Sequence, residues 1–379
     1  MAEKKLKILF ISRVHPPIVG GMENQSYHLV RSVGRLGKTE TIINRGGKKF
    51  LPFFIPFALI KALFIASRFD VVHLSDGVMA PIGYLIKLIH PKVKIVATIH
   101  GLDITYAKKN NLYKIVNIGA LARLDKLIAV SRQTKKLAEQ FGLKTSRISV
   151  IPNGVDPDEI RSTECCREDL LAIVRLSKAN ALKDNIRKKS AQAVFILTLG
   201  RLCKRKGVRW FIENVMPNMP DNVFYLVAGS GAEKIALEHA IHRHKLDNRV
   251  CLLGAVSNND RKVLFNTCDV FVQPNIRLEG DAEGFGITLL EAATAELPIV
   301  ASDLEGIQEA ISNNKNGFLV EPHNPLAFAS AIHKLLNDPD FRQKCGSSAR
   351  KYTEKHYSWS GIAKKYYQEF QALAFNKSE

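Results

Sequence analysis

The sequence predicts an α/β protein made of two doubly wound parallel sheets. Three observations support this fold class. The chain has 379 residues, more than one hydrophobic core usually organises. Short runs rich in Val and Ile alternate with helical patterns in two separate series. Polar and glycine-containing motifs follow several of these runs, at the strand ends where ligands of such sheets bind.

The two series of apolar runs predict the strands. The first sheet is expected at KILFIS (7–12), DVVHLS (70–75), KIVATIH (94–100), KLIAVS (126–131) and ISVIPN (148–153). The second is expected at VFILTLGRL (194–202), VFYLVAGSG (223–231), RVCLLG (249–254), DVFVQP (269–274), PIVAS (298–302) and GFLVEP (317–322). Two facing sheets of this kind would place their sites across a shared cleft.

The domain boundaries follow from the change in pattern between the two series. Residues 156–191 are polar, charged and poor in strand signals, which is typical of one or two helices. We therefore predict an N-terminal domain at 1–160, a connector at 161–190 and a C-terminal domain at 191–356. After about residue 325 the pattern is helical to the end of the chain.

Residues 50–66 (FLPFFIPFALIKALFIA) form the most hydrophobic segment. Two prolines and a lysine interrupt it, and it falls short of the about 20 apolar residues that span a membrane. We expect a buried helix that begins near Pro56. The alternative is that the phenylalanines of residues 50–54 form a loop that enters a lipid interface.

The net charge is +19 and is unevenly distributed. Residues 1–150 contain 25 Lys and Arg against 8 Asp and Glu, a net charge of +17. This asymmetry favours a polyanionic partner for the N-terminal domain. Nucleic acid, anionic lipid and a phosphorylated carrier all fit electrostatically, and solubility alone is the simpler explanation.

The sequence gives no sign of a metal site or of export. The six cysteines are scattered without the two-residue spacing of zinc or redox motifs. Of the histidines at 239, 242 and 244, positions 239 and 244 fall on different helix faces, and no carboxylate or cysteine completes a ligand set. The first apolar run is too short for a signal-peptide core. We expect a cytoplasmic protein.

Two strand ends in the N-terminal domain carry candidate binding residues. Gly20 and Gly21 lie where the first strand leads into a helix, and adjacent glycines let backbone amides approach a phosphate closely. His100 ends a strand, so its imidazole can reach a sugar hydroxyl or developing charge. A glycine pair forms only a tight turn about as often as it binds a phosphate, and a single histidine is more often structural.

The C-terminal domain carries the more specific motifs. Arg201 and Lys206 follow a strand, and two fixed cations there can neutralise a diphosphate without magnesium. Glu283 and Glu291 flank a Gly-Phe-Gly turn that opens a helix in EGFGITLLE. Two carboxylates so placed can bracket a nucleotide sugar, one at the hexose and one at the ribose. Gly284 and Gly286, in the same turn, allow exposed backbone amides near the phosphates.

With these motifs the sequence resembles the retaining glycosyltransferases of family 4, or group 1, whose GT-B architecture has two Rossmann-like domains. The resemblance covers essentially the whole chain. The segments that carry it appear in the family's order: GGMEN, DVVH, HGLD, VSR, VIPNGVD, LGRLCKRKG, VAGSG, EGFGITLLEA and PIVASDLEGIQE. It also implies that the last helix, about 357–379, joins the N-terminal domain.

The resemblance implies a role for each candidate residue. In the N-terminal domain Gly21 would contact the donor phosphates, His100 would reach the donor sugar, and Asn153 would face the cleft in support. In the C-terminal domain Arg201 and Lys206 would bind the diphosphate. Glu283 would bind the sugar hydroxyls and Glu291 the ribose. Backbone amides would line the sugar and phosphate pocket, namely those of Phe285, Gly286 and Ile287.

Two departures from the family's pattern lie beside the donor region. Glu296 stands where the family usually has glycine before its PVVAS-like strand, and Glu305-Gly306 replaces a common pair of glycines. The reaction class is unaffected, whereas the donor remains open. We expect a UDP-sugar, with a GDP-sugar as the alternative.

The resemblance implies a hexosyltransferase that retains the anomeric configuration and needs no metal or other cofactor. Its partners would be the nucleotide sugar, a lipid-linked or glycan acceptor, and an anionic membrane surface reached through the N-terminal domain from the cytoplasmic side. The alternatives are a nucleotide-sugar epimerase on the same fold and, less favoured, a nucleic-acid-binding protein. A dehydrogenase would require G-x-G-x-x-G after a strand, which the sequence lacks.

Overall fold

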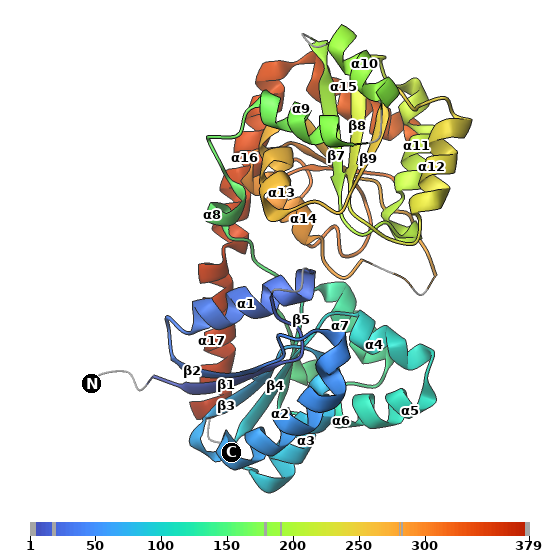
Figure 1. Ribbon diagram of the computed structural model, residues 1–379. Coiled ribbons are helices and arrows are strands. Elements are labelled where there is room, and N and C mark those ends of the chain that lie inside the picture. Colours follow the sequence, from blue (N-terminus) through green and yellow to red (C-terminus); the bar gives the residue numbers. More distant parts are fainter. Residues whose placement is uncertain are drawn as a thin grey trace. The chain divides into compact units, whose positions relative to one another are not determined.

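A computed structural model describes residues 5–16, 20–177, 180–189, 192–279, 281 and 283–375. The chain divides into two compact units (Figure 1). Unit 1 is Met1–Gly154 together with Trp359–Glu379, and unit 2 is Val155–Ser358. The final helix, α17 (Trp359–Phe375), therefore belongs to the N-terminal unit. Each unit is described by itself.

Unit 1 is built on a parallel sheet with the strand order β2-β1-β3-β4-β5-β6. The chain starts at β1, moves outward to β2 and then returns to the other side of β1, so the topology switches between β1 and β3. Sites in such sheets lie beyond the carboxyl ends of the strands at this switch. The strands are β1 (Lys7–Ser12), β2 (Lys38–Ile43), β3 (Val71–Leu74), β4 (Lys94–Ile99), β5 (Lys126–Ala129) and β6 (Ile148–Val150).

Helices cover both faces of this sheet because its strands are apolar on both sides. One face packs against α1 (Gly21–Val33) and α17. The opposite layer contains α2 (Leu51–Ile65), α3 (Ala80–Ile89), α4 (Leu102–Thr105), α5 (Asn111–Tyr113), a π-helical turn (Lys114–Ile118), α6 (Gly119–Leu121) and α7 (Arg132–Gln140).

The structure corrects the expectation for residues 50–66. The helix begins at Leu51 rather than near Pro56, because proline is tolerated in a first helical turn and Pro52 occupies that turn. It is not buried as expected, since within it only Phe54, Ala58 and Ala62 are buried. It is also not a loop. By length and composition alone the helical stretch Lys48–Arg68 could cross a membrane, but its buried side belongs to the core of unit 1.

Unit 2 repeats the architecture with the strand order β12-β11-β10-β7-β8-β9, all parallel. Its strands are β7 (Val194–Leu199), β8 (Val223–Ala228), β9 (Val250–Gly254), β10 (Val270–Gln273), β11 (Ile299–Ser302) and β12 (Phe318–Val320). One face packs in a single core against α11 (Val208–Asn214), α12 (Lys234–Arg243) and α15 (Pro325–Asn337). The remaining helices include α13 (Asn258–Thr267), α14 (Ile287–Thr294) and α16 (Pro339–Tyr357).

The segment expected to connect the domains belongs to unit 2 instead. Residues 161–190 contain α9 (Arg167–Leu176) and α10 (Asn180–Lys188), and α8 (Pro157–Ile160) precedes them. Arg167 explains this placement, because its guanidinium donates to the carbonyls of Thr267 and Ala193 and pairs with Asp269 at 3.0 Å. The chain passes between the units at Gly154–Val155 and again at Ser358–Trp359.

Glu296 occupies a turn whose backbone conformation explains the glycine usually found there. Its φ is 60°, in the left-handed region that side chains rarely adopt. The carboxylate accepts from Arg350 Nη1 at 2.9 Å and from Ser347 Oγ at 3.1 Å, both on α16. The hydrogen bond from Arg350 lowers the pKa of Glu296. The hydrogen bonds between the Glu296 side chain and α16 thus offset the backbone strain.

Candidate active site

The turn after β7 brings Lys206 to the carboxyl ends of the unit 2 strands. Lys206 ends a short 3₁₀ turn (Lys204–Lys206) and is 8% exposed. Gly207 follows with φ 65°, and a Cβ at this position would lie 1.8 Å from the carbonyl oxygen of Pro274. Only glycine allows the turn to approach the end of β10 so closely. The glycine of the LGRLCKRKG motif therefore positions the lysine.

Glu283 meets this turn and forms the most highly charged part of the site. Its Oε2 lies 2.7 Å from Lys206 Nζ and 3.6 Å from Arg205 Nη1, and it accepts a hydrogen bond from Asn275 Nδ2 at 3.0 Å. Burial alone would raise the pKa of Glu283, but the two cations outweigh it and the pKa is lowered. The carboxylate is therefore ionised at neutral pH.

The backbone of Glu283 is fixed by the turn after β11. Gly306 has φ 84°, and a Cβ there would lie 2.0 Å from the carbonyl oxygen of Glu283. One glycine of the usual pair is thus required for close packing, while Glu305 replaces the other.

Glu291 lies on α14 and is also paired. Its Oε1 accepts from Arg261 Nη1 at 2.9 Å, and its side chain is buried. The helix begins at Ile287 after Gly286. The amides of Phe285 and Gly286 donate to no other described residue, whereas the amide of Ile287 donates to the carbonyl of Phe285 at 3.1 Å. The turn offers two amides to a ligand rather than the three expected.

Buried polar atoms without a hydrogen-bond partner gather at the same edge of unit 2. Among the described residues they include Gln273 Nε2, Asn275 Oδ1, Ser302 Oγ and Arg261 Nε. An unpaired buried polar group costs about 1–3 kcal/mol. Several at the ends of β10 and β11 and on the adjacent α13 indicate a place where a polar ligand binds.

Arg201 differs from the other predicted cation. It follows Gly200 at the end of β7, is exposed, and makes no ion pair with another described residue. The structure therefore brings Lys206 and Glu283 together and leaves Arg201 open to solvent. Arg205 and Arg261 were not identified from the sequence. Arg205 lies inside the quoted KRKG stretch, so its neighbour Lys206 was the available signal, whereas nothing in the sequence pointed to Arg261.

In unit 1, His100 is held in one orientation at the end of β4. Its Nε2 lies 3.0 Å from the carbonyl oxygen of Ser75, which can only accept, so Nε2 carries the hydrogen. The carboxylate of Asp103 accepts from the amides of His100, Gly101 and Gly77 at 2.8–3.1 Å. Nδ1 is therefore the nitrogen left for a ligand. Asp103 stands in the HGLD motif but received no role from the sequence.

A buried ion pair lies at the topological switch of unit 1. Arg13 follows β1, Asp76 follows β3, and Arg13 Nε lies 2.9 Å from Asp76 Oδ2. Burial raises the pKa of Asp76, and the charge of Arg13 opposes that shift. This pair was not predicted from the sequence, although polar residues that follow adjacent strands are a usable signal.

The remaining predicted residues of unit 1 lie at the start of α1 and after the end of β6. Gly20 precedes α1, which begins at Gly21, so the expected helix N-terminus is present. Residues 17–19 of the same loop lie outside the described residues. Asn153 follows β6 and is buried, and its Oδ1 has no partner among the described residues.

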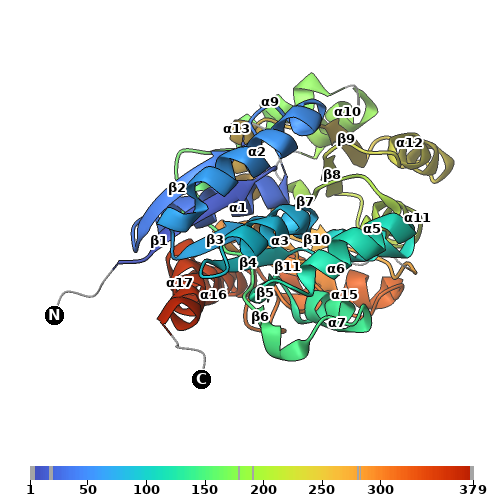
Figure 2. The ribbon, with the colours of Figure 1, turned by 90° about the horizontal axis from the view of Figure 1, so that it is seen from below.

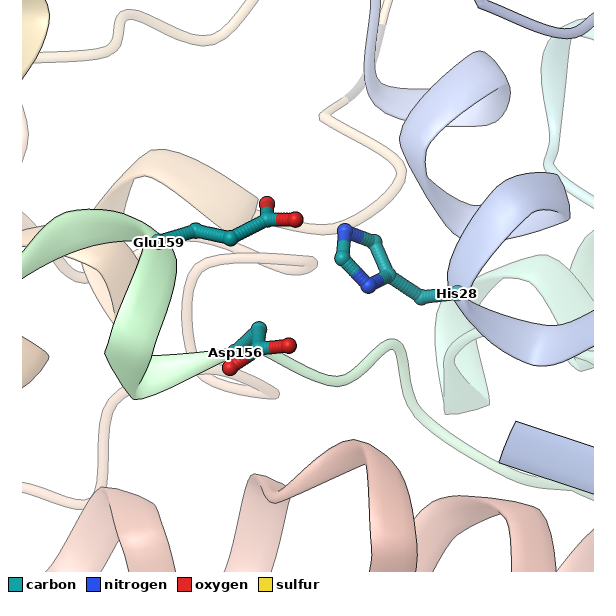
Figure 3. A group of neighbouring side chains, drawn as sticks. All are labelled: His28, Asp156 and Glu159. Atoms are coloured by element: carbon teal, nitrogen blue, oxygen red, sulfur yellow. The ribbon is translucent and has the colours of Figure 1, made fainter. Parts of the chain in front are cut away.

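No metal centre is assigned to the described part of the chain. His28, Asp156 and Glu159 are residues of types that bind metals (Figure 3). His28 belongs to unit 1, whereas Asp156 and Glu159 belong to unit 2. Because the two units are described separately, these residues support no assignment. In the group of histidines at 239, 242 and 244, His242 Nδ1 lies 3.7 Å from Asp247 Oδ1.

The chain is similar over most of its length to proteins that transfer sugars. An uncharacterized glycosyltransferase of Methanocaldococcus jannaschii is 26% identical over 95% of this chain and 96% of its own. The GPI3 subunit of phosphatidylinositol N-acetylglucosaminyltransferase from Saccharomyces cerevisiae is 25% identical, covering 92% and 79%. A GDP-mannose-dependent phosphatidylinositol monomannoside mannosyltransferase of Mycobacterium tuberculosis is 24% identical, covering 79% and 76%.

Solved structures show the same fold. The Anabaena protein HepE, crystallised with UDP, superposes with a TM-score of 0.76 at 19% identity, covering 97% of this chain and all of its own. The two parallel six-stranded sheets with flanking helices are therefore the GT-B architecture.

Two family models match successive parts of the chain. Residues 23–159 match "Glycosyltransferase Family 4" and residues 181–352 match "Glycosyl transferases group 1". The transferase models and relatives do not favour the epimerase alternative. The chain therefore belongs to the family 4, group 1 glycosyltransferases and is an enzyme that transfers a sugar.

Proposed function

We propose that this enzyme transfers a hexose from a nucleotide diphosphate sugar to a lipid-linked or glycan acceptor, with retention of the anomeric configuration. UDP is the favoured nucleotide and GDP the alternative. The observation that carries the proposal is the ionised Glu283, held 2.7 Å from Lys206 beside unpaired buried polar atoms. A carboxylate and fixed cations in one pocket can bind the sugar hydroxyls and the diphosphate of one donor.

In unit 2 the donor is proposed to bind along the turn before α14. Glu283 accepts hydrogen bonds from the sugar hydroxyls, while Lys206 and Arg201 contact the diphosphate. The free amides of Phe285 and Gly286 add donors. Ile287 lines the same pocket.

Glu291 is proposed to accept from the ribose hydroxyls. Arg261 acts on it as a positioning residue, because the 2.9 Å contact between Arg261 Nη1 and Glu291 Oε1 fixes the orientation of the carboxylate.

Unit 1 is proposed to supply the remaining contacts to the donor. His100 presents Nδ1 to the sugar, because Nε2 donates to Ser75. Gly21, at the start of α1, offers a backbone amide to a phosphate. Asn153 supports this region through its unpaired Oδ1.

The proposed reaction is a front-face substitution. The bond between the anomeric carbon and the diphosphate oxygen breaks while the acceptor oxygen bonds to the same face of that carbon. The departing phosphate takes the proton of the acceptor hydroxyl, so no protein base is required. Lys206 and Arg201 stabilise the negative charge that grows on the leaving group, and no metal or other cofactor is needed.

The acceptor side of the proposal rests on charge and on the relatives. Two of them are named for phosphatidylinositol-based acceptors. The first 150 residues of this chain carry a net charge of +17, which suits an anionic membrane surface. We propose a peripheral enzyme at the cytoplasmic face of the cell membrane.

The test is a donor and product assay. Purified protein is screened by thermal shift against UDP, GDP and ADP, and the sugar donors of the stabilising nucleotide are then offered with a lipid extract. NMR of the product's anomeric proton gives its configuration. We expect retention and unchanged turnover in EDTA. An inverted product contradicts the proposed mechanism, and turnover lost in EDTA but restored by magnesium or manganese contradicts metal independence. Conversion of the donor without acceptor points to an epimerase.

A further inference from the structure

The exposed apolar side chains of this chain are concentrated in one part of unit 1. Of the 18 large hydrophobic side chains that are exposed among the described residues, 14 lie between residues 50 and 116. They are Phe50, Phe53, Ile55, Phe57, Ile60, Phe64, Leu85, Leu88, Ile89, Leu102, Tyr106, Leu112, Ile115 and Val116. Single exposed hydrophobic residues are ordinary on soluble proteins, but a group of this size marks an interaction surface.

Helix α2 contributes the largest share. Its buried residues Phe54, Ala58 and Ala62 recur every four positions and face the core, and Leu51, Leu59, Leu63 and Ile65 pack partly buried beside them. The opposite side of the helix points outward. On that outer side Phe53 is 75% exposed and Phe64 is 79% exposed. A surface helix normally presents charged residues there. Lys61 is the only charged residue within α2.

Neighbouring helices extend the apolar surface. α3 packs against α2 and α6, and the π-helical turn follows α5 in the same layer (Figure 2). α3 exposes Leu85, Leu88 and Ile89, and the segment of α5 and the π-helical turn exposes Leu112 and Ile115. We call the outer surface of α2, α3, α5 and the π-helical turn the α2–α5 face.

The charge of these segments indicates which class of partner the apolar surface binds. Residues 41–124 contain twelve Lys or Arg and three acidic residues, Asp70, Asp76 and Asp103, of which Asp76 and Asp103 are buried. Lys48 and Lys49 immediately precede α2, and Arg68 follows it. Exposed apolar side chains flanked mainly by cations match a layer of anionic headgroups over acyl chains. A protein interface would ordinarily include acidic as well as basic residues around its rim.

We propose that the α2–α5 face inserts into the interface of an anionic phospholipid bilayer, with α2 lying in the membrane plane. This inference rests on the proposed function, in which the acceptor is lipid-linked. An interfacial helix buries its apolar side about 5–10 Å deep. Because apolar insertion is not screened by salt, binding persists at salt concentrations that weaken the exposed cations. The structure thus assigns the membrane contact to apolar side chains, with the cations selecting anionic lipid.

The experiment is vesicle flotation of the full chain and of two matched triple variants. Phe53→Gln, Phe57→Gln and Phe64→Gln remove three outward phenylalanines of α2. Leu176→Gln, Ile235→Gln and Leu326→Gln are the control, because these side chains of unit 2 are 66–89% exposed. Both variants leave the buried cores intact, which circular dichroism and thermal melting verify.

The vesicles are phosphatidylcholine alone and phosphatidylcholine mixed with phosphatidylglycerol. We expect the unmodified chain to float with the anionic vesicles and to remain bound in about 0.5 M NaCl. The phenylalanine variant is expected to bind at least about 100-fold more weakly, on the scale of burying such side chains, while the control binds like the unmodified chain.

Three outcomes overturn the inference. In the first, the phenylalanine variant binds the vesicles as well as the control does. In the second, binding of the unmodified chain disappears in high salt. In the third, sedimentation shows a dimer that only the phenylalanine variant breaks, and nothing floats, so a second copy covers the face. Nucleotide binding, measured by thermal shift without vesicles, separates the two proposals. A chain that binds UDP but does not float loses only this inference, whereas one that floats but binds no nucleotide loses the proposed function.

Discussion

Replacing Lys206 by alanine tests the pair on which the donor site depends. Lys206 and Arg205 lie 2.7 Å and 3.6 Å from the same oxygen of Glu283. At an effective dielectric constant of about 20, unit charges at these distances attract by about 6 and about 5 kcal/mol before desolvation. Lys206 therefore supplies somewhat more than half of the attraction. Its loss leaves Arg205 and Asn275 as partners, so the protein should fold with reduced stability.

The expected catalytic effect is a fall in kcat of about 10²–10³-fold, the scale for removing one preorganised group that meets developing charge. KM for the donor should change less. The matched control is Lys204→Ala, because Lys204 is exposed in the same 3₁₀ turn. The measurement is steady-state kinetics of both variants, with folding checked by thermal melting. Wild-type kcat in Lys206→Ala, with only weakened donor affinity, would show that Lys206 does not act on the leaving group and would shift that role to Arg201.

The same variant has a predicted pH dependence. The folded-state pKa of Glu283 is lowered, so its contribution to stability is present above the unfolded-state pKa and is lost as pH falls through the folded value. Without Lys206, burial is less opposed and the pKa of Glu283 rises. The acid limb of the stability profile should then move to higher pH, which thermal melting across an acid pH series measures. An unchanged acid limb would contradict the assigned cause of the shift.

The remaining predictions concern the rest of the donor site. Glu291→Ala should raise the donor KM more than it lowers kcat, because the ribose does not change during transfer; equal losses of both would argue against ribose binding. Arg261→Met should also raise the donor KM, and Arg261→Lys should partly restore it. If both Arg261 variants lowered the melting temperature equally without changing the donor KM, Arg261 would be structural. Gly306→Ala should lower stability by at least about 1 kcal/mol and reduce activity, since the added Cβ meets the Glu283 carbonyl; wild-type melting would refute that packing.

The parallel sheets were predictable except for β2, because buried strands are apolar throughout and contrast with the patterns between them. β2 (Lys38–Ile43) was missed, since it is a largely polar and half-exposed edge strand. Lys206 and Glu283 were predictable because each stands in a local motif beside glycines. Arg261 could not be found this way, since it meets Glu291 only when α13 and α14 pack together. The connector was misassigned for the same reason, because the contacts of Arg167 join residues about 100 positions apart.

The exposure of α2 was not predicted from the sequence, for a different physical reason. A helix that is apolar on all sides has no polar stripe to reveal which side faces water, so sequence alone favours burial. Here the small residues Ala58 and Ala62 share the buried side with Phe54, while most of the other phenylalanines point outward. Only the packing of the layer could distinguish the two arrangements.

The turn that holds Glu296 has a consequence for how this sequence can change over time. Arg350 and Ser347 hold the Glu296 carboxylate, and this compensates for a backbone conformation that favours glycine. A glycine at 296 would relax the backbone and leave Arg350 without this partner. Loss of Arg350 first would leave the strain uncompensated. Related chains are therefore expected to vary at these two positions together, with the arginine dispensable wherever the turn carries glycine.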